Sequence, residues 1–217
     1  MDFLSSIVML IILIFSAILH EVAHGFVAER FGDPTARLAG RLTLNPKKHI
    51  DPFMSILLPL LLLFSGSPIV FGAAKPVPID PFNLKEGRKD VALVALSGPL
   101  TNVLIAILAS FLFKIINTPI IEGLIPFFIL NTLYLILYTI VNINLLLAIF
   151  NLLPIPPLDG SKVFGLLLPE KTANAYLGLG GIGMIIVFLL LLNPIGGFSL
   201  GSLISSLLMF SEKLLGI

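Results

Sequence analysis

Long apolar stretches, separated by short polar segments, run through the whole chain. Three of these stretches are long enough to cross a bilayer as helices, which takes about 20 residues. They are Phe3 to about Phe31, Val91 to about Ile116, and Leu124 to about Leu153. Gly32-Asp33-Pro34 predicts the end of the first helix, because glycine and proline commonly follow helix ends. The pattern therefore predicts an all-α polytopic membrane protein built on three core helices.

Two further apolar regions depart from this pattern. Phe53–Phe64 has only 12 residues and contains Pro59. That length is more typical of a re-entrant segment than of a spanning helix, although a full span is the alternative. Near the end of the chain, Leu177–Leu192 and Phe198–Phe210 predict a helical hairpin. Its turn is expected at Asn193–Gly197, where proline and glycine cluster.

The segment Ser67–Pro78 differs from the helices around it, because prolines flank a short apolar run. Ile69, Val70 and Phe71 are residue types favoured in strands, and proline suits strand ends. The segment predicts a short strand-like element at the membrane edge, with a loop packed over the core as the alternative. A strand at this place would be able to pair with an unwound peptide by strand addition.

The composition supports membrane insertion and limits the possible partners and metal ligands. Of the 217 residues, 57% are hydrophobic and 12% are charged, against about 25% charged in soluble domains. The net charge of +1 excludes a basic nucleic-acid surface, so no nucleic-acid partner is expected. The absence of cysteine excludes thiolate ligands, so any metal must be held by nitrogen and oxygen. The first apolar stretch lacks a basic start and a cleavage site, which favours a retained helix.

Basic residues gather in one part of the chain. Nine of the 13 Lys and Arg lie between Arg30 and Lys89. Because cytoplasmic loops are enriched in Lys and Arg, we expect this region on the cytoplasmic side and the N-terminus on the other. A re-entrant Phe53–Phe64 keeps all nine on one side, whereas a full span would divide them.

The sequence His20-Glu21-Val22-Ala23-His24 places titratable groups at the end of the first apolar stretch. Ionisable side chains are costly inside a bilayer and are usually functional there. Two histidines four residues apart project from one face of a helix, and zinc suits two imidazoles plus a carboxylate with one position left open. His20 and His24 are therefore predicted metal ligands. Glu21 is predicted to act as the general base and not as a ligand.

Asp159 is the predicted third ligand. It lies in Asn151–Gly160, directly after the third core helix, where three prolines break the helix. Irregular backbone at membrane depth is tolerated only within protein or beside a cavity. Other polar residues are expected to be structural: ion pairs in the basic region for Asp51, Asp80, Glu86 and Asp90, an interfacial position for His49, and interhelical hydrogen bonds for Asn102, Asn142 and Asn144.

Taken in order, these motifs resemble the site-2 protease family of intramembrane zinc metalloproteases. The matching pieces are His20–His24, Phe71–Pro78, Ser97–Asn102 and Asn151–Gly160. The resemblance implies one zinc ion per chain with His20, His24 and Asp159 as ligands. It also implies a catalytic Glu21, and an Asn151 near the metal that stabilises the oxyanion or positions the substrate.

The same resemblance implies a single membrane-embedded metalloprotease domain over residues 1–217. Its catalytic core covers about 3–169 and its C-terminal hairpin about 177–210, without a PDZ or nucleotide-sensing domain. The implied function is regulated intramembrane proteolysis of transmembrane substrates in the cell membrane, with an active site open towards the cytoplasm. Two alternative functions fit the sequence less well. A proton or ion transporter does not need the strict motif spacing and usually has repeated halves, and an inactive adaptor does not need an intact motif.

Overall fold

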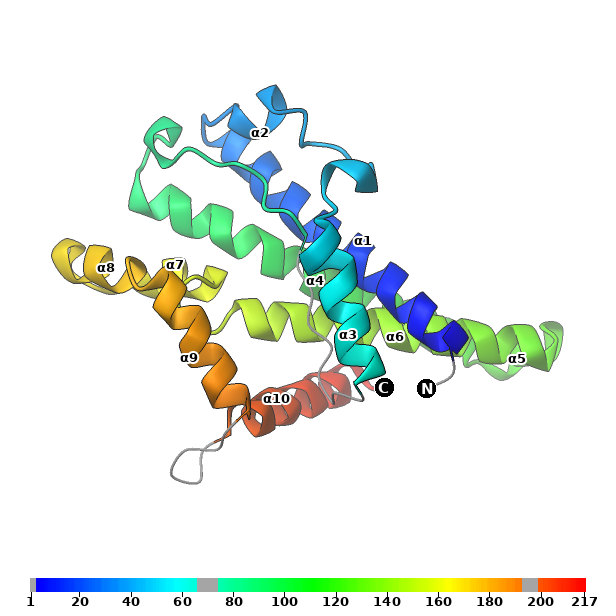
Figure 1. The fold of residues 1–217 in the computed structure, drawn as a ribbon. Helices are drawn as coiled ribbons and strands as arrows, with labels where there is room; N and C mark the ends of the chain where they lie inside the picture. The colour runs from blue at the N-terminus through cyan, green and yellow to red at the C-terminus, as the bar shows by residue number, and fades with distance from the viewer. Residues whose placement is uncertain (1–2, 66–73, 193–198) are drawn as a thin grey trace.

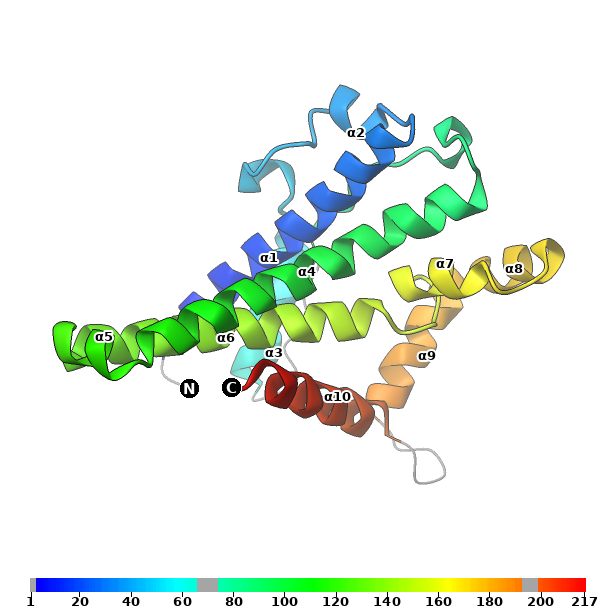
Figure 2. The same ribbon diagram turned by 180° about the vertical axis from the view of Figure 1, so that it is seen from behind.

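The computed structural model describes residues 3–65, 74–192 and 199–217. Its framework is three long helices, α1 (Phe3–Arg30), α4 (Arg88–Ile116) and α6 (Phe127–Asn151). Within the described residues, these are the three single helices that are long and apolar enough to cross a membrane. Figures 1 and 2 show α4 packed against both α1 and α6. The prediction of an all-α polytopic membrane protein is confirmed.

Small side chains allow these helices to approach one another closely. On α4, a row of buried alanines faces its neighbours: Ala92, Ala95, Ala106 and Ala109. Close backbone approach through small residues is the usual basis of helix packing in membranes, where no hydrophobic force drives helices together. Large apolar side chains such as Phe111 remain exposed on the outside, as expected for a surface that faces lipid.

The shorter elements lie between and after the three long helices. They are α2 (Thr35–Leu38), a 3-10 turn (Pro46–Lys48), a π-helical turn (Pro52–Leu57) that continues into α3 (Leu58–Phe64), a second 3-10 turn (Pro81–Asn83), α5 (Pro119–Leu124), α7 (Asp159–Gly165), α8 (Glu170–Leu177), α9 (Gly180–Leu192) and α10 (Leu200–Leu215). The residues Pro52–Leu62 form a short apolar helix, below the length that a full span requires.

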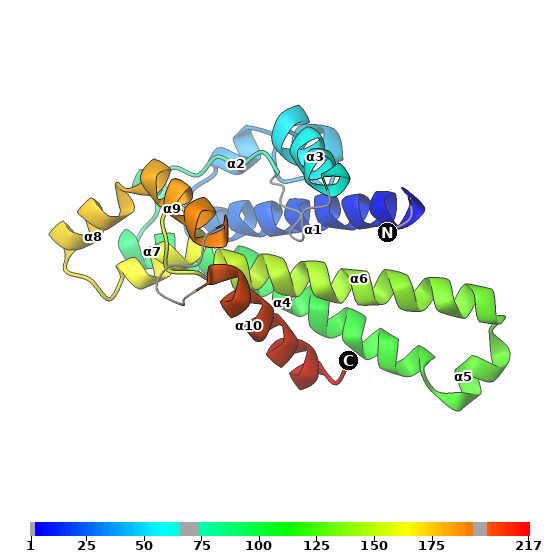
Figure 3. The same ribbon diagram turned by 60° about the horizontal axis from the view of Figure 1, so that its bottom comes forward.

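The predicted C-terminal hairpin is present as two helices, α9 and α10, and its turn at Asn193–Gly197 lies outside the described residues. Figure 3 shows both helices near the end of α6 that leads into α7. Leu153 and Leu158, from the segment between α6 and α7, form a buried cluster with Val187 of α9 and with α10. The hairpin therefore supports the segment that carries Asp159.

Residues Pro154–Ala175 contain α7 and most of α8, two short helices that the apolar pattern of the sequence did not predict. The predicted strand at Ile69–Phe71 lies outside the described residues. The adjoining stretch, Ala74–Asp80, has no regular secondary structure.

A buried carboxylate fixes the connection after α1. Asp33 is fully buried and accepts hydrogen bonds from the Asp80 backbone N–H at 2.7 Å, from Asn83 Nδ2 at 3.0 Å, and from Thr35. Burial acts to raise the pKa of Asp33, but these hydrogen bonds outweigh it and hold the pKa below its usual range. The end of α1 is thereby tied to the segment that precedes α4.

Acidic pH is expected to weaken this junction. Because the pKa of Asp33 is lower in the folded state than the unfolded value of about 3.9, its stabilising effect is fully present above that pH. The effect disappears as the pH falls through the folded pKa. Asp33→Asn is expected to lower the free energy of unfolding by about 1–3 kcal/mol near neutral pH. Thermal unfolding in detergent should then depend less on acidic pH in the variant, and identical pH profiles would contradict this role.

Candidate metal centre

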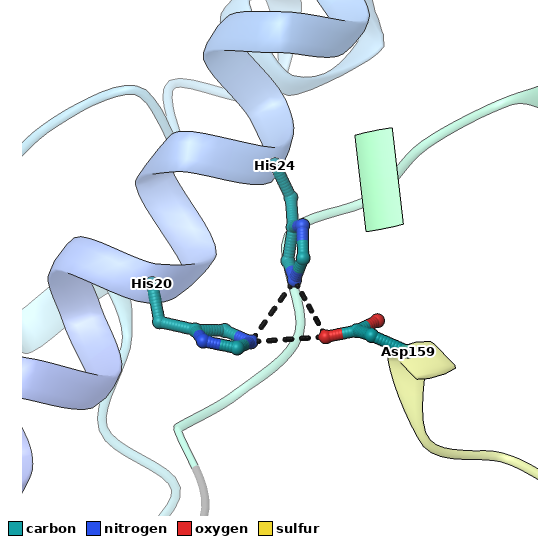
Figure 4. Close-up of side chains that lie close together, drawn as sticks. All are labelled: His20, His24 and Asp159. Carbon is teal, nitrogen blue, oxygen red and sulfur yellow. Dashed lines mark hydrogen bonds and ion pairs between the residues drawn. The ribbon is translucent and has the colours of Figure 1, made fainter. Parts of the chain in front are cut away.

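Two histidines of α1 face the interior of the helix bundle together. His20 and His24 are one helical turn apart, so their side chains leave the same face. Their rings meet edge to face with centroids 4.6 Å apart, and their Nε2 atoms are 3.0 Å apart. Both residues are buried. Figure 4 shows the two Nε2 atoms converging on one point.

Asp159 supplies the third group at this point. It is the first residue of α7, and its Oδ2 lies 3.1 Å from Nε2 of both His20 and His24. One ligand atom from each of the three residues falls within 4.8 Å of the others. The other carboxylate oxygen, Oδ1, accepts a hydrogen bond from Lys162 Nζ at 3.0 Å. The structure therefore brings together the three residues that the sequence predicts as ligands (Figure 4).

A hydrogen-bond partner on Nδ1 orients each imidazole. His24 Nδ1 lies 2.7 Å from the backbone carbonyl of Val94, an acceptor, so Nδ1 must carry the proton. His20 Nδ1 lies 2.6 Å from Asn102 Oδ1. Both rings therefore turn Nε2 towards Asp159. Histidine ligands of metals commonly donate their other N–H to such a partner.

Gly98 of α4 forms the floor beneath the two rings. A Cβ atom at this position would lie 2.5 Å from His24 Cε1 and 2.6 Å from His20 Nε2, closer than side chains pack. Any larger residue would therefore displace the imidazoles. The family resemblance includes Ser97–Asn102, but the contact of Gly98 with the two histidines was not predicted from the sequence.

The three groups suit zinc. Two imidazole nitrogens and one carboxylate oxygen are a standard set of protein ligands for a catalytic zinc site, which keeps a fourth position open. Their burial, the outer hydrogen bonds of both histidines and the close contact of both rings with Gly98 all favour a held ion.

Glu21 is held beside this group by the backbone. Its Oε2 accepts a hydrogen bond from the Val77 N–H at 2.8 Å. The segment before Val77 is fixed in turn, because Arg41 donates to the carbonyls of Lys75 and Pro76, and the Lys75 N–H donates to the His49 carbonyl. In the described part of the chain, Oε1 of Glu21 makes no hydrogen bond. One carboxylate oxygen is thus anchored and the other is available.

The structure does not join Asn151 to the three predicted ligands. Asn151 is the last residue of α6, and its Nδ2 donates to the Leu147 carbonyl one turn earlier, at 2.9 Å. Asn102 contacts His20 instead. Asn102 and Asn144 do form the expected interhelical bonds, whereas Asn142 bonds within α6 to Tyr138.

Five other polar residues, between α1 and the first turn of α4, were predicted to be structural. The predicted ion pairing holds for Glu86, which pairs with Lys89. It is wrong for Asp51 and Asp80, which cap the turns that follow them, and for Asp90, which is buried and accepts from the Glu86 N–H. Short polar side chains commonly make such local backbone bonds. His49 is fully buried and bonds to the Thr43 carbonyl.

A buried group of two histidines and one carboxylate inside a bundle of apolar helices defines a membrane-embedded metalloenzyme. Comparison with known proteins agrees. The model of peptidase family M50 matches residues 8–130 and 128–192. The chain therefore belongs to peptidase family M50, the site-2 protease family, and is a zinc metallopeptidase.

Individual relatives give the same assignment. A Bacillus subtilis protein named "Putative zinc metalloprotease YwhC" is 35% identical over 198 residues, which cover 91% of this chain and 86% of the relative. A Mycobacterium tuberculosis protein of the same description, Rip2, is 30% identical over 179 residues, or 82% of this chain and 64% of Rip2. The chain thus spans less than two thirds of Rip2. No solved structure matches the chain.

Proposed function

We propose that this chain is an intramembrane protease, which hydrolyses peptide bonds in or near the transmembrane segments of membrane proteins. The observation that carries the proposal is the burial of His20, His24 and Asp159 around one point within the bundle of membrane-spanning helices. At 1.5 Å per residue, His24 and His20 lie about 9 Å and about 15 Å along α1 from Arg30. Those depths are below the headgroups if Arg30 marks the membrane surface.

The active site is proposed to open towards the cytoplasm of the cell. The basic residues concentrate between the end of α1 and the start of α4, and cytoplasmic loops carry the excess of Lys and Arg. The same end of α1 bears the two histidines. Water would then reach Glu21 from the cytoplasmic side, along the shorter path through the membrane.

We assign His20, His24 and Asp159 as the zinc ligands and Glu21 as the catalytic base. Zinc, when bound, supplies a Lewis acid that polarises a carbonyl group and lowers the pKa of a water molecule to about 7. Lys162 holds Oδ1 of Asp159, which leaves Oδ2 directed at the two histidines. The carboxylate is thereby kept in an orientation that offers a single oxygen.

Glu21 is proposed to move protons, and Asn151 to stabilise charge. The Val77 N–H anchors Oε2 of Glu21, so that Oε1 is free to accept a proton from the attacking water and to deliver it to the departing amine. The amide of Asn151 has two N–H groups, and its bond to Leu147 uses one of them. The second is proposed to donate to the developing oxyanion; loss of one such donor costs about 3 kcal/mol in other enzymes.

Removal of the metal tests this function. The purified protein, reconstituted in vesicles, is expected to contain one zinc per chain and to cleave a transmembrane peptide. Treatment with a chelator should abolish cleavage, and added zinc should restore it. The control is a water-soluble peptide with the same residues around the cleaved bond. Cleavage that survives complete removal of zinc would contradict the chemistry, and cleavage of the soluble peptide alone would contradict an intramembrane role.

A further inference from the structure

A network of buried polar side chains connects His20 to two neighbouring helices. Asn102 of α4 and Asn144 of α6 are fully buried, and Ser16 of α1 is almost so. Asn102 Oδ1 lies 2.6 Å from His20 Nδ1, and Asn102 Nδ2 donates to Asn144 Oδ1 at 2.8 Å. Asn144 Nδ2 donates to Ser16 Oγ at 2.9 Å. This network therefore links all three spanning helices behind the candidate metal centre.

Backbone carbonyls determine the direction of every hydrogen bond in this network. Asn144 Nδ2 lies 2.8 Å from the Ile140 carbonyl, which can only accept, so this end of the Asn144 amide must be the donor. The other end is then an oxygen and requires a donor, which is Asn102 Nδ2. The Ser16 carbonyl, 3.5 Å from Asn102 Nδ2, favours the same orientation.

The same logic extends to the imidazole. With Nδ2 of Asn102 directed at Asn144, its oxygen faces His20, and an oxygen needs a donor there. His20 Nδ1 must therefore carry the ring proton. Nε2, which lies 3.1 Å from Asp159 Oδ2, would then offer its lone pair to a metal ion shared with this carboxylate oxygen.

We propose that Asn102 and Asn144 are positioning residues, which fix the orientation of the His20 ring and keep its proton on Nδ1 so that Nε2 is ready to bind the metal. This inference rests on the assignment of His20 as a zinc ligand. Its physical basis is that a buried amide with a single satisfied orientation cannot turn over without leaving a carbonyl and an N–H unpaired, which is costly in an apolar interior. His24 does not need such a network, because its Nδ1 donates directly to a backbone carbonyl.

The position of the proton can be measured in the unaltered protein. The chain has only three histidines, so NMR of zinc-loaded protein with isotope-labelled histidine resolves each imidazole. We expect His20 to carry its proton on Nδ1 and to bind zinc through Nε2. Coordination of zinc by Nδ1 of His20, with the proton on Nε2, would overturn the inference without the need for any variant.

Zinc affinity of variants tests the role of the asparagines. Asn102→Leu is expected to weaken zinc binding about 10- to 100-fold, as losses of outer partners do elsewhere, and Asn144→Leu to weaken it by about tenfold. The matched control is Asn142→Leu on the same helix, because the Asn142 amide donates to Tyr138 within α6, and its zinc affinity should equal that of the wild type. Equal zinc affinity in all three variants would overturn the inference.

Rescue separates positioning from simple structural support. In Asn102→Asp the carboxylate can still accept from His20 Nδ1, so this variant should bind zinc more tightly than Asn102→Leu. A purely structural role predicts that a buried charge is no better than leucine, and that result would count against the proposal. If neither variant folds, as judged by helix content and thermal unfolding, the NMR measurement decides.

These measurements use no peptide substrate. A protein that loads zinc as described but cleaves no transmembrane peptide would therefore overturn the proposed function and leave this inference standing. Conversely, loss of zinc in His20→Ala together with unchanged affinity in Asn102→Leu would keep the ligand assignment and remove the role of Asn102. Retention of zinc in His20→Ala would remove the ligand assignment itself.

Discussion

Glu21→Gln is expected to retain zinc and to lose peptide cleavage by about 10²- to 10⁴-fold, the usual contribution of a general base. Glutamine has nearly the shape of glutamate, and its carbonyl oxygen can still accept the N–H of Val77 that holds Glu21. Its amide, however, cannot take up a proton from water. Since Glu21 lies outside the group formed by His20, His24 and Asp159, the metal should remain bound.

The measurement pairs zinc content with cleavage of a transmembrane peptide in vesicles. Glu29→Gln provides a matched control, because Glu29 lies on the same helix and pairs with Arg37 on the surface. That control should cleave at the wild-type rate. Wild-type activity in Glu21→Gln would remove Glu21 from the mechanism, whereas loss of zinc from this variant would place Glu21 among the ligands.

Gly98→Ala is expected to disrupt zinc binding through a single methyl group. The added Cβ would lie within 2.6 Å of atoms in both imidazoles, and these rings cannot retreat without breaking their bonds to Asn102 and Val94. Overpacking of this kind costs about 1–3 kcal/mol. If the whole cost falls on the metal centre, zinc binding weakens by about 5- to 150-fold.

Zinc competition with a chelator would measure this effect. Gly181→Ala is the control, because Gly181 lies within α9 and a Cβ there meets no atom of the described residues within 4 Å. Alanine favours helices over glycine, so the control should be at least as stable as the wild type. An unchanged zinc affinity in Gly98→Ala would show that the two histidines move freely over α4 and do not form a fixed centre.

The long helices could be predicted from the sequence, because an apolar stretch long enough to span a membrane is sufficient to indicate a helix. The first predicted helix, Phe3 to about Phe31, agrees with α1, and the second begins three residues late, at Val91 instead of Arg88. Helices α7 and α8 were missed, since their sequence is short, mixed in polarity and preceded by prolines. Tertiary contacts hold this region: Gly165, the last residue of α7, and Leu168, between α7 and α8, accept hydrogen bonds from Arg88 of α4. No local pattern reveals this contact.

The candidate site was predicted where chemistry shows in the residue type. The motif at His20–His24 and the isolated carboxylate of Asp159 indicated a metal site, and their proximity follows the prediction. The roles of Gly98 and Asn102 depend on which face of α4 turns towards α1. Sequence periodicity did not show this, because α4 is apolar on nearly all sides. Asn151 was placed near the metal by resemblance alone, and that placement stays a prediction.

The candidate ligands are far apart in the order in which the chain is made. His24 and Asp159 are 135 positions apart, a gap that a ribosome covers in about 7–27 s at 5–20 residues per second. During that interval, α1 has been synthesised with two imidazoles but without the carboxylate that completes the group. A growing chain therefore cannot assemble the centre until α4, α6 and α7 have followed. Hydrolytic activity is thus withheld until Asp159 has joined the two histidines.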